Sequence, residues 1–368
     1  MALDRNKVLH ECRSACLRSI DARDKVFVST GANGKWYFDW ISDNCGTPKM
    51  HVGVEYYMEK PEGLSNNISW IANTAGHMPD VESATADILF SGQNIEHLWK
   101  KDIIGFLTEA HRIVKPGGML VLDSPNRDIT AAYCISHPEH LIEFTVPEMR
   151  ELLSAAGFDV TLCKGIFLCR DPRSGTLLPF DTEDADPPFS ILERCVLGAD
   201  AAEQSYIWWI HAVRTLRAPD MARLSTLVDQ CWDVAWPERM QRMLSNVGVE
   251  VSDEGVATIQ CAAGEAGAML YGPYAPIDPG KYTVMVWMKL LKAVEDNKPV
   301  AIADVATGNG DVIVRREVLA KELSTKRYTP ISMKFDLEVM NFGFQSRVFS
   351  NGAAHIVVQK RSDLQAQA

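Results

Sequence analysis

The pattern of hydrophobic residues changes along the chain, and this change limits the fold more than any other feature. In residues 1–180, short buried-strand runs such as 25–28, 51–55 and 86–91 alternate with helix-like segments. This alternation predicts βαβ units and a mostly parallel, doubly wound sheet. From residue 247 onward the pattern consists of short alternating strands separated by Gly, Pro and Asn turns, which is typical of an antiparallel sandwich. The chain is therefore expected to contain more than one domain.

These patterns predict a division of the 368 residues into four parts. The expected fold is an α/β, Rossmann-like doubly wound sheet, then a helical connector, then an all-β sandwich. The connector is rich in tryptophan, and two interpretations of its aromatic residues remain open: core packing between domains, or a wall of a sugar site. The predicted parts are an α/β domain (1–180), an acidic linker with the helical connector (181–246), the sandwich (247–360) and a disordered tail (361–368).

Charge and cysteine usage exclude several classes of protein. Lys and Arg number 37 against 48 Asp and Glu, a net charge of −11, and no basic tract is present, which disfavours nucleic acid as a partner. No apolar run approaches the ~18–20 residues of a membrane span, and the first twenty residues do not resemble a signal peptide. The nine cysteines are scattered without a CxxC pair, which predicts free thiols in a cytoplasmic protein.

A small-residue loop follows the first expected strand. Such a loop lets the backbone and the start of the next helix approach a nucleotide-like ligand. Glu55 ends the second expected strand about twenty residues later, where a carboxylate can bind the two hydroxyls of a ribose. Together the two features indicate a ligand site. The loop consists of Ser29, Thr30, Gly31, Ala32, Asn33 and Gly34.

Four further segments occur in a characteristic order: 73–79, 87–98 with its Glu-His pair, 109–122 with the run EAHRIVKPGGMLVL, and 152–158. With the glycine loop and Glu55, they make residues 20–165 resemble the class I S-adenosylmethionine-dependent methyltransferases. One departure concerns the first strand, where the family carries an acidic residue and this chain reads Val28-Ser29-Thr30. Hydroxyl or amide groups of Ser29, Thr30 or Asn33 are the available replacements.

The resemblance implies S-adenosylmethionine as the cofactor and assigns binding roles to the matching residues. The glycine loop would hold the amino-acid end of the cofactor, and Glu55 the ribose hydroxyls. The remaining positions are Asn73, Thr74 and Ala75 around the adenine, and Ser91 and Gly92 beneath the cofactor.

Methyl transfer to a hydroxyl needs the acceptor to be positioned and its proton removed. His97 follows the fourth strand, and His137 and His140 lie beyond the fifth, so each is a candidate base. Asn126 and Arg127 are candidates for orienting the acceptor. A structural role for each histidine remains open, as does a metal site of His137, Glu139 and His140. Because Pro138 interrupts that spacing, we expect no metal.

The last third of the chain, over residues 247–360, resembles the β-sandwich domains of the carbohydrate-binding-module type, most clearly at 270–284, 303–305 and 344–359. This resemblance implies a glycan or sugar substrate, and with the first domain it predicts O-methylation of a sugar in a bacterial surface polysaccharide. Two alternatives remain: a catalytically degenerate scaffold in glycan assembly, and a methyltransferase acting on a small natural product. The sandwich is equally suited to pair copies of the chain into an oligomer.

Overall fold

The computed structural model describes residues 5–135, 137–180, 188–253 and 255–367. The chain folds into two compact units. The first consists of Met1–Tyr133 and Ile142–Ala235, and the second of Cys134–Leu141 and Trp236–Ala368. Among the described residues, none of the helices is long and apolar enough to cross a membrane.

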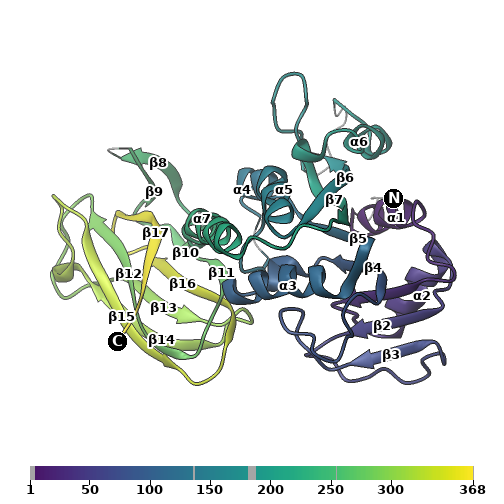
Figure 1. Ribbon diagram of the computed structural model, residues 1–368. Helices are drawn as coiled ribbons and strands as arrows, with labels where there is room; N and C mark the ends of the chain where they lie inside the picture. The colour runs from purple at the N-terminus through teal and green to yellow at the C-terminus, as the bar shows by residue number, and fades with distance from the viewer. Residues whose placement is uncertain (1–4, 136, 181–187, 254, 368) are drawn as a thin grey trace. The chain divides into compact units, whose positions relative to one another are not determined.

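The first unit is built on a seven-stranded sheet with the order β3-β2-β1-β4-β5-β7-β6 (Figure 1). The pairs from β3 to β5 are parallel, whereas β7 runs antiparallel to both of its neighbours. The strand order reverses between β1 and β4, as in other doubly wound sheets. The strands are β1 (Val26–Thr30), β2 (Met50–Val54), β3 (Ile68–Ile71), β4 (Ala86–Gly92), β5 (Val114–Pro125), β6 (Phe158–Leu168) and β7 (Ser205–Arg214).

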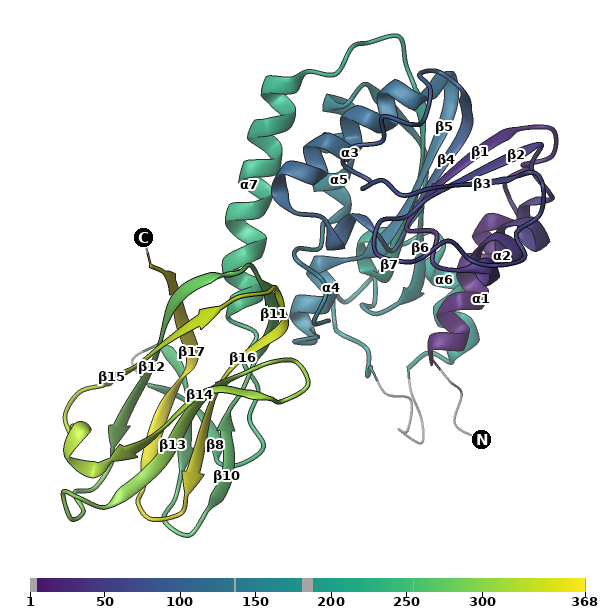
Figure 2. The same cartoon turned by 90° about the horizontal axis from the view of Figure 1, so that it is seen from below.

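Helices cover both faces of this sheet, which confirms the predicted Rossmann-like architecture. Figure 2 shows α1, α2 and α6 on one face and α3 and α5 on the other. The first face is rich in aromatic core residues, among them Phe27, Phe38 and Phe90. The helices are α1 (Arg5–Leu17), α2 (Lys35–Cys45), η1 (Ile95–His97), α3 (Lys100–Ile113), α4 (Arg127–Ala132), α5 (Val146–Ala155), α6 (Ile191–Gly198), η2 (Ala202–Gln204) and α7 (Met221–Met240).

The predicted helical connector is wrong for its tryptophan-rich part. Residues 205–214 form strand β7, inserted between β5 and β6, and the side chains of Trp208 and Trp209 are completely buried. A strand that is covered on both faces has a continuous apolar run, and such a run has the same appearance as a buried helix. Of the connector, only α7 is a long helix. Residues 181–187 of the predicted linker lie outside the described residues.

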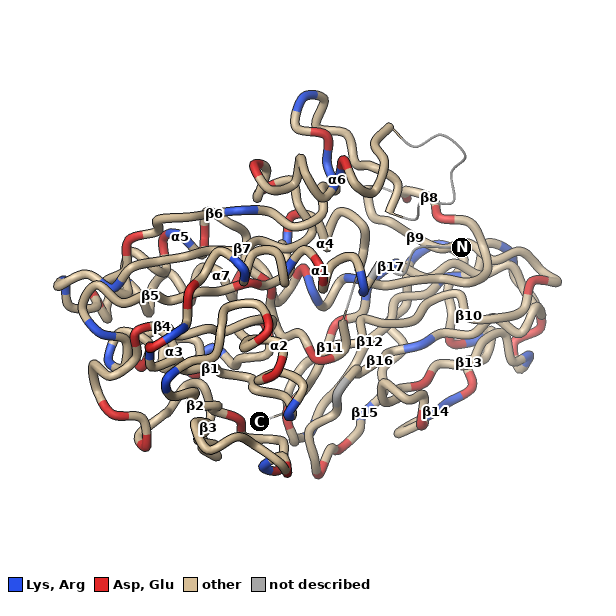
Figure 3. The backbone as a smooth tube through the Cα atoms, turned by 90° about the vertical axis from the view of Figure 1, so that its right-hand side faces the viewer, with Lys and Arg blue, Asp and Glu red and all other residues tan. Residues whose placement is uncertain are grey.

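The second unit contains two antiparallel five-stranded sheets, as the turn-rich pattern predicts. One has the order β10-β16-β13-β14 with β11 also paired to β16, and the other has the order β15-β12-β17-β9-β8. Lys, Arg, Asp and Glu occur along the strands of both sheets (Figure 3). The strands are β8 (Val249–Asp253), β9 (Val256–Cys261), β10 (Ala266–Leu270), β11 (Pro273–Ile277), β12 (Gly280–Leu290), β13 (Pro299–Ala306), β14 (Val312–Leu319), β15 (Thr329–Leu337), β16 (Asn341–Asn351) and β17 (Ile356–Ala366), with the short helix η3 (Ala320–Glu322).

Two predicted boundaries differ from the observed ones. The first unit continues to Ala235 and omits residues 134–141, which belong to the second unit. The predicted disordered tail is also wrong, since residues up to Ala366 belong to β17 and pair with β12. The alternation there is weak, and the partner strand supplies the hydrogen bonds that hold these polar residues in place.

Candidate functional site at the carboxyl ends of β1, β2, β4 and β5

The glycine loop lies at the carboxyl end of β1, where doubly wound sheets place their ligands. Gly31 has a φ of 69° and Gly34 a φ of 84°, values that only glycine adopts without strain. A Cβ on Gly31 would lie 3.1 Å from Oδ1 of Asn94, so the loop also passes close to the end of β4. Gly34 is the N-cap of α2 and provides no side-chain cap, which leaves the first N–H groups of this helix to other partners. Ala32 is fully buried within the loop.

The end of β1 carries hydroxyl groups in place of a carboxylate. Ser29 and Thr30 are both buried, and Oγ of Ser29 lies 2.9 Å from Nε2 of His51 on β2. Asn94 donates hydrogen bonds to Oγ1 of Thr30 at 3.3 Å and to Oγ of Ser91 at 3.1 Å. The predicted residues at the ends of β1 and β4 therefore lie together, joined by an asparagine that the sequence did not single out.

The carboxylate of Glu55 is held by the loop that follows it. Its Oε1 accepts the N–H groups of Tyr56 at 2.9 Å and Tyr57 at 2.7 Å. Both tyrosines are exposed, and their rings meet edge to face at 5.2 Å. The second oxygen, Oε2, has no hydrogen-bond partner among the residues that the structure describes. The carboxylate is therefore oriented while one oxygen stays available to a ligand.

The loop after β3 packs closely on α3. Gly76 approaches α3 so closely that a Cβ there would lie 2.9 Å from Cα of Asp102. Asn73 donates from Nδ2 to Asp80 at 3.1 Å, and its buried Oδ1 has no partner within the described parts of the chain. Thr74 accepts the N–H of His77 at 3.1 Å, and Ala75 is buried.

Glu109 and Arg112, the first and last residues of the run EAHR, form hydrogen bonds with the backbone of this loop. Glu109 accepts the N–H of Met78 at 2.8 Å, and Arg112 donates to the carbonyl groups of Met78 and Val81, each at 2.8 Å. The two side chains also form an ion pair at 2.8 Å. Hydrogen bonds to Arg112 and Met78 N–H keep the pKa of Glu109 below its usual value despite partial burial. This pair fixes the loop that carries Asn73, Thr74 and Ala75.

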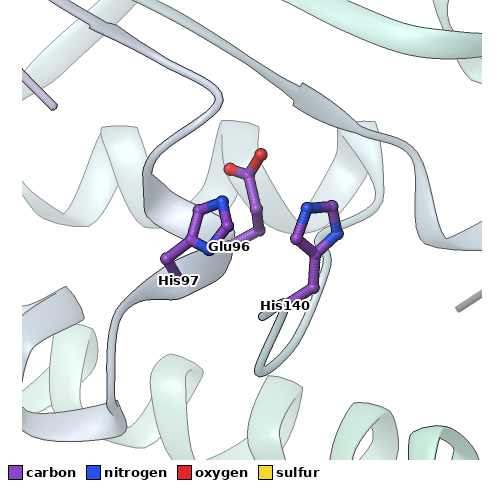
Figure 4. Close-up of side chains that lie close together, drawn as sticks. All are labelled: Glu96, His97 and His140. Carbon is purple, nitrogen blue, oxygen red and sulfur yellow. The ribbon is translucent and has the colours of Figure 1, made fainter. Parts of the chain in front are cut away.

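His97 belongs to the 3-10 helix η1, which begins three residues after β4. It follows Glu96, and the two side chains are drawn in Figure 4. The side chain of Glu96 is fully buried, whereas His97 is partly exposed. This position at the end of β4 keeps His97 at the ligand-binding edge of the sheet, where the sequence predicts a base.

Asn126 and Arg127 have structural partners. Asn126 caps α4 and donates to the carbonyl group of Glu203 at 3.0 Å. Arg127 is buried, and its guanidinium forms an ion pair with Glu148 at 2.5 Å. These contacts join the end of β5 to the segments around η2 and α5. A role in orienting the acceptor stays a prediction for both residues.

His137 and His140 belong to the second unit, in the segment 134–141. Their rings stack with centroids 4.4 Å apart. Arg239 donates to the carbonyl groups of both residues, at 2.5 Å to His137 and 3.3 Å to His140. The backbone of this segment is therefore held by α7, and the role of either histidine as a base stays a prediction.

A buried ion pair lies at the same edge, and the sequence gives no signal for it. Asp123 near the end of β5 is fully buried and accepts hydrogen bonds from Nε of Arg13 at 2.6 Å and from Nη2 at 3.1 Å. Gln93 donates to the same carboxylate at 2.9 Å. Burial disfavours the charged guanidinium, but the Asp123 carboxylate outweighs this and raises the pKa of Arg13. The two charged residues are 110 positions apart, and no local pattern connects them.

The loop after β3, the carboxylate ending β2 and the Glu109–Arg112 pair all lie in one stretch of the chain, from α2 to β5. Residues 41–122 match the family model of a methyltransferase domain. This part of the first unit is therefore similar in sequence to a methyltransferase domain, and it lies on a Rossmann-like sheet. The match begins after the glycine loop, so residues 29–34 lie outside it.

Two mycobacterial proteins show a similar partial match. A probable S-adenosylmethionine-dependent methyltransferase of Mycolicibacterium smegmatis is 36% identical over 92 residues, which are 24% of this chain and 34% of that protein. A protein of the same description from Mycobacterium tuberculosis is 36% identical over 93 residues, 24% of this chain and 32% of its own length. The chain thus spans about a third of the length of the curated relatives it matches.

Solved methyltransferase structures resemble this chain more distantly. A putative methyltransferase of Haloferax volcanii, in complex with the activator Trm112, has 16% identity and a TM-score of 0.41, covering 57% of this chain and 91% of its own. The 1,6-didemethyltoxoflavin-N1-methyltransferase of Burkholderia thailandensis, with S-adenosylhomocysteine bound, has 16% identity and a TM-score of 0.37, covering 56% and 78%.

Proposed function

We propose that this protein is an S-adenosylmethionine-dependent methyltransferase whose site lies at the carboxyl ends of β1, β2 and β4. The observation that carries the proposal is the methyltransferase-domain match over residues 41–122, since it contains Glu55 and the clamped loop after β3. The mycobacterial relatives named as S-adenosylmethionine-dependent enzymes match a similar length of the chain.

The residues present fit this cofactor. Oε2 of Glu55 would accept the ribose hydroxyls, and the buried, unpartnered Oδ1 of Asn73 would accept a hydrogen bond from the adenine amino group. Gly31 and Gly34 leave the backbone open to the amino-acid end. The bound cofactor supplies an activated methyl group, so the protein has to position the acceptor and take up its proton.

His97 is the proposed base because it follows β4 at the same edge as the cofactor residues. A neutral imidazole can accept a proton from a hydroxyl near neutral pH. The acceptor is proposed to be a sugar of a bacterial surface polysaccharide, which gives O-methylation. Support for this class comes from the two-sheet second unit and its resemblance to carbohydrate-binding modules. The same unit is proposed to pair copies of the chain, and the nine free thiols favour a cytoplasmic location.

Calorimetry on the full chain tests the cofactor proposal. S-adenosylmethionine and S-adenosylhomocysteine should both bind, and Glu55→Gln should weaken binding ~10–100-fold because a hydrogen bond to a charged group contributes ~1.5–3 kcal/mol. Glu62→Gln, an exposed glutamate of the following loop, is the matched control. If neither compound binds the wild-type chain, the protein is not this kind of enzyme.

Transfer of an isotope-labelled methyl group tests the acceptor class. The full chain is incubated with labelled S-adenosylmethionine and, in separate reactions, with fragments of bacterial polysaccharides or with small aromatic alcohols. Label on sugar hydroxyls supports the glycan proposal, whereas label only on small aromatic alcohols supports natural-product methylation instead.

The hydroxyl-lined end of β1 favours a second candidate, a degenerate methyltransferase fold that serves as a scaffold. Ser29 lies in the stretch Val28–Thr30, where the family has an acidic residue, and it already contacts His51. Its hydroxyl provides no negative charge for the cofactor's ammonium group. Cofactor binding without methyl transfer to any acceptor would support this scaffold.

A further inference from the structure

The ion pair of Arg13 and Asp123 is embedded in hydrogen bonds from three elements. Asp123 lies on β5, Arg13 on α1, and Gln93 directly follows β4. Besides its side-chain bond to the Asp123 carboxylate, Gln93 donates its backbone N–H to the carbonyl oxygen of Asp123 at 2.8 Å. The carboxylate is thus fixed by three side-chain hydrogen bonds at the edge of the sheet where ligands bind.

Gly92 makes room for this pair. A Cβ at this position would lie 2.7 Å from Nη2 of Arg13 and 2.7 Å from Oδ1 of Asp123. Its φ is outside the range that requires glycine, so the constraint is space rather than backbone conformation. The same Cβ would also lie 2.6 Å from Cζ of Phe90, so Gly92 leaves space for the ion pair and for this ring.

Stability alone does not account for the pair. Removing two charges from water is costly, and well-packed apolar side chains are often equally stable in such places. A buried ion pair at a ligand-binding edge is better explained by something that its donors bind. Arg13 retains one such donor, because Nη1 has no hydrogen-bond partner among the residues that the structure describes.

The guanidinium of Arg13 lies over one ring of an aromatic cluster that α1 and α2 form. It lies 5.1 Å from the ring centroid of Trp40, whose Nε1 donates to Ser14 at 2.8 Å. The ring of Trp36 is 6.4 Å from Trp40 and 6.5 Å from His10. Trp36 lies two residues after Gly34, the last residue of the glycine loop, and it is 53% exposed despite its aromatic neighbours. Trp40 thus neighbours both the fixed cation and the exposed indole, so this cluster combines an apolar face with a hydrogen-bond donor.

We propose that Arg13 and Trp36 bind the methyl acceptor as a sugar ring, with Nη1 donating to a ring substituent oxygen and the indole packing on the C–H face. Asp123 and Gln93 are positioning residues that orient the guanidinium. A sugar ring has this combination of an apolar face and polar edges. The inference rests on the proposed function for its place in the reaction, but the sugar contact itself does not need the cofactor.

Saturation-transfer NMR on the full chain tests the contact, with methyl α-glucopyranoside, methyl α-mannopyranoside and methyl α-galactopyranoside as probes. The measurement is made with and without S-adenosylhomocysteine. At least one glycoside should bind the wild-type chain, and Arg13→Ala should weaken it about tenfold through the lost hydrogen bond. Trp36→Ala should weaken it comparably. Arg18→Ala, which removes an exposed arginine paired with Asn44, is the matched control.

A purely structural role for Arg13 gives a different result. Arg13→Ala would then lower the stability of the fold while the folded protein kept its sugar affinity, and Trp36→Ala would have no effect. Because Trp36 is half-exposed, its variant is expected to fold even if Arg13→Ala does not. Unchanged sugar binding in Trp36→Ala, or no glycoside binding to the wild type, overturns the inference. If glycosides bind in this pattern but S-adenosylhomocysteine does not, the proposed function fails and the sugar contact stands.

Discussion

Oγ of Ser29 lies 2.9 Å from Nε2 of His51, so a buried serine–histidine contact occupies the end of β1. The imidazole is packed between the rings of Phe27 and Phe38, with centroids at 4.9 and 4.7 Å. Burial in this apolar environment lowers the pKa of His51 to about 3. A neutral pair therefore replaces the charge that the methyltransferase resemblance leads us to expect.

This contact predicts a pH dependence of stability. Below its ordinary pKa of 6.5, His51 takes up a proton in the unfolded chain but not in the folded one. The stabilising contribution is therefore complete above pH 6.5 and falls by ~1.4 kcal/mol per pH unit as the pH drops towards 3. His51→Gln should flatten this slope in denaturant unfolding measured between pH 4 and 6.5. His355→Gln, in the second unit, is the control, and an unchanged slope in His51→Gln contradicts the prediction.

Gly105→Ala should destabilise the first unit. In an ordinary helix interior this change stabilises by ~1 kcal/mol. Here the new Cβ would collide with the carbonyl oxygen of Gly76, and the overpacking cost of ~1–3 kcal/mol should outweigh that gain. Denaturant unfolding gives the sign, and faster amide exchange in residues 73–77 locates the effect. Thr108→Ala on the same helix is the control, and a more stable Gly105→Ala variant would refute this packing argument.

Cys195 should be an unusually reactive thiol. A hydrogen bond from the Cys12 thiol lowers its pKa to about 7, against the opposing effect of burial. Figures 1 and 2 both show α1, which carries Cys12, beside α6, which carries Cys195. Alkylation of Cys195 by iodoacetamide should reach half its maximal rate near pH 7, because the thiolate is the reactive form. Mass spectrometry of the labelled peptides measures this rate.

The Cys12 donor can be separated from other influences on Cys195. Cys12→Ala removes the hydrogen bond and should move the midpoint of the rate profile to higher pH. Cys12→Ser keeps a donor and should retain most of the effect. Equal midpoints in the two variants would show that the hydrogen bond does not activate Cys195.

Removal of residues 361–368 should destabilise the second unit. Residues Ser362–Ala366 of β17 pair with Tyr282–Val286 of β12, and Asp363 accepts a hydrogen bond from Nε1 of Trp287 at 2.9 Å. Each hydrogen bond lost costs ~1 kcal/mol, so the unit should unfold at a lower denaturant concentration. Removal of Ala368 alone is the control. Identical unfolding of the two truncated chains would mean that these residues contribute nothing to the sandwich.

Sequence reasoning succeeded where short-range patterns dominate. Alternating strands and helices predicted the doubly wound sheet, and the glycine loop and Glu55 were both placed at its ligand-binding edge. The sequence predicts a helix at residues 205–214, and this prediction is wrong because an apolar run without a clear period does not distinguish a buried helix from a fully buried strand. The prediction of a disordered tail is wrong for a different reason. Its polar residues form a strand only because β12 lies beside them.

The sequence by itself determined the fold class of both units and the positions of the glycine loop and Glu55 at the ends of β1 and β2, since each depends on spacing within tens of residues. Only the tertiary structure decided which groups meet at the site. Arg13 reaches Asp123 across 110 residues, and Gly92 leaves the space they share. Such contacts arise when several strand ends and a helix converge, and the distance along the chain carries no information about that convergence.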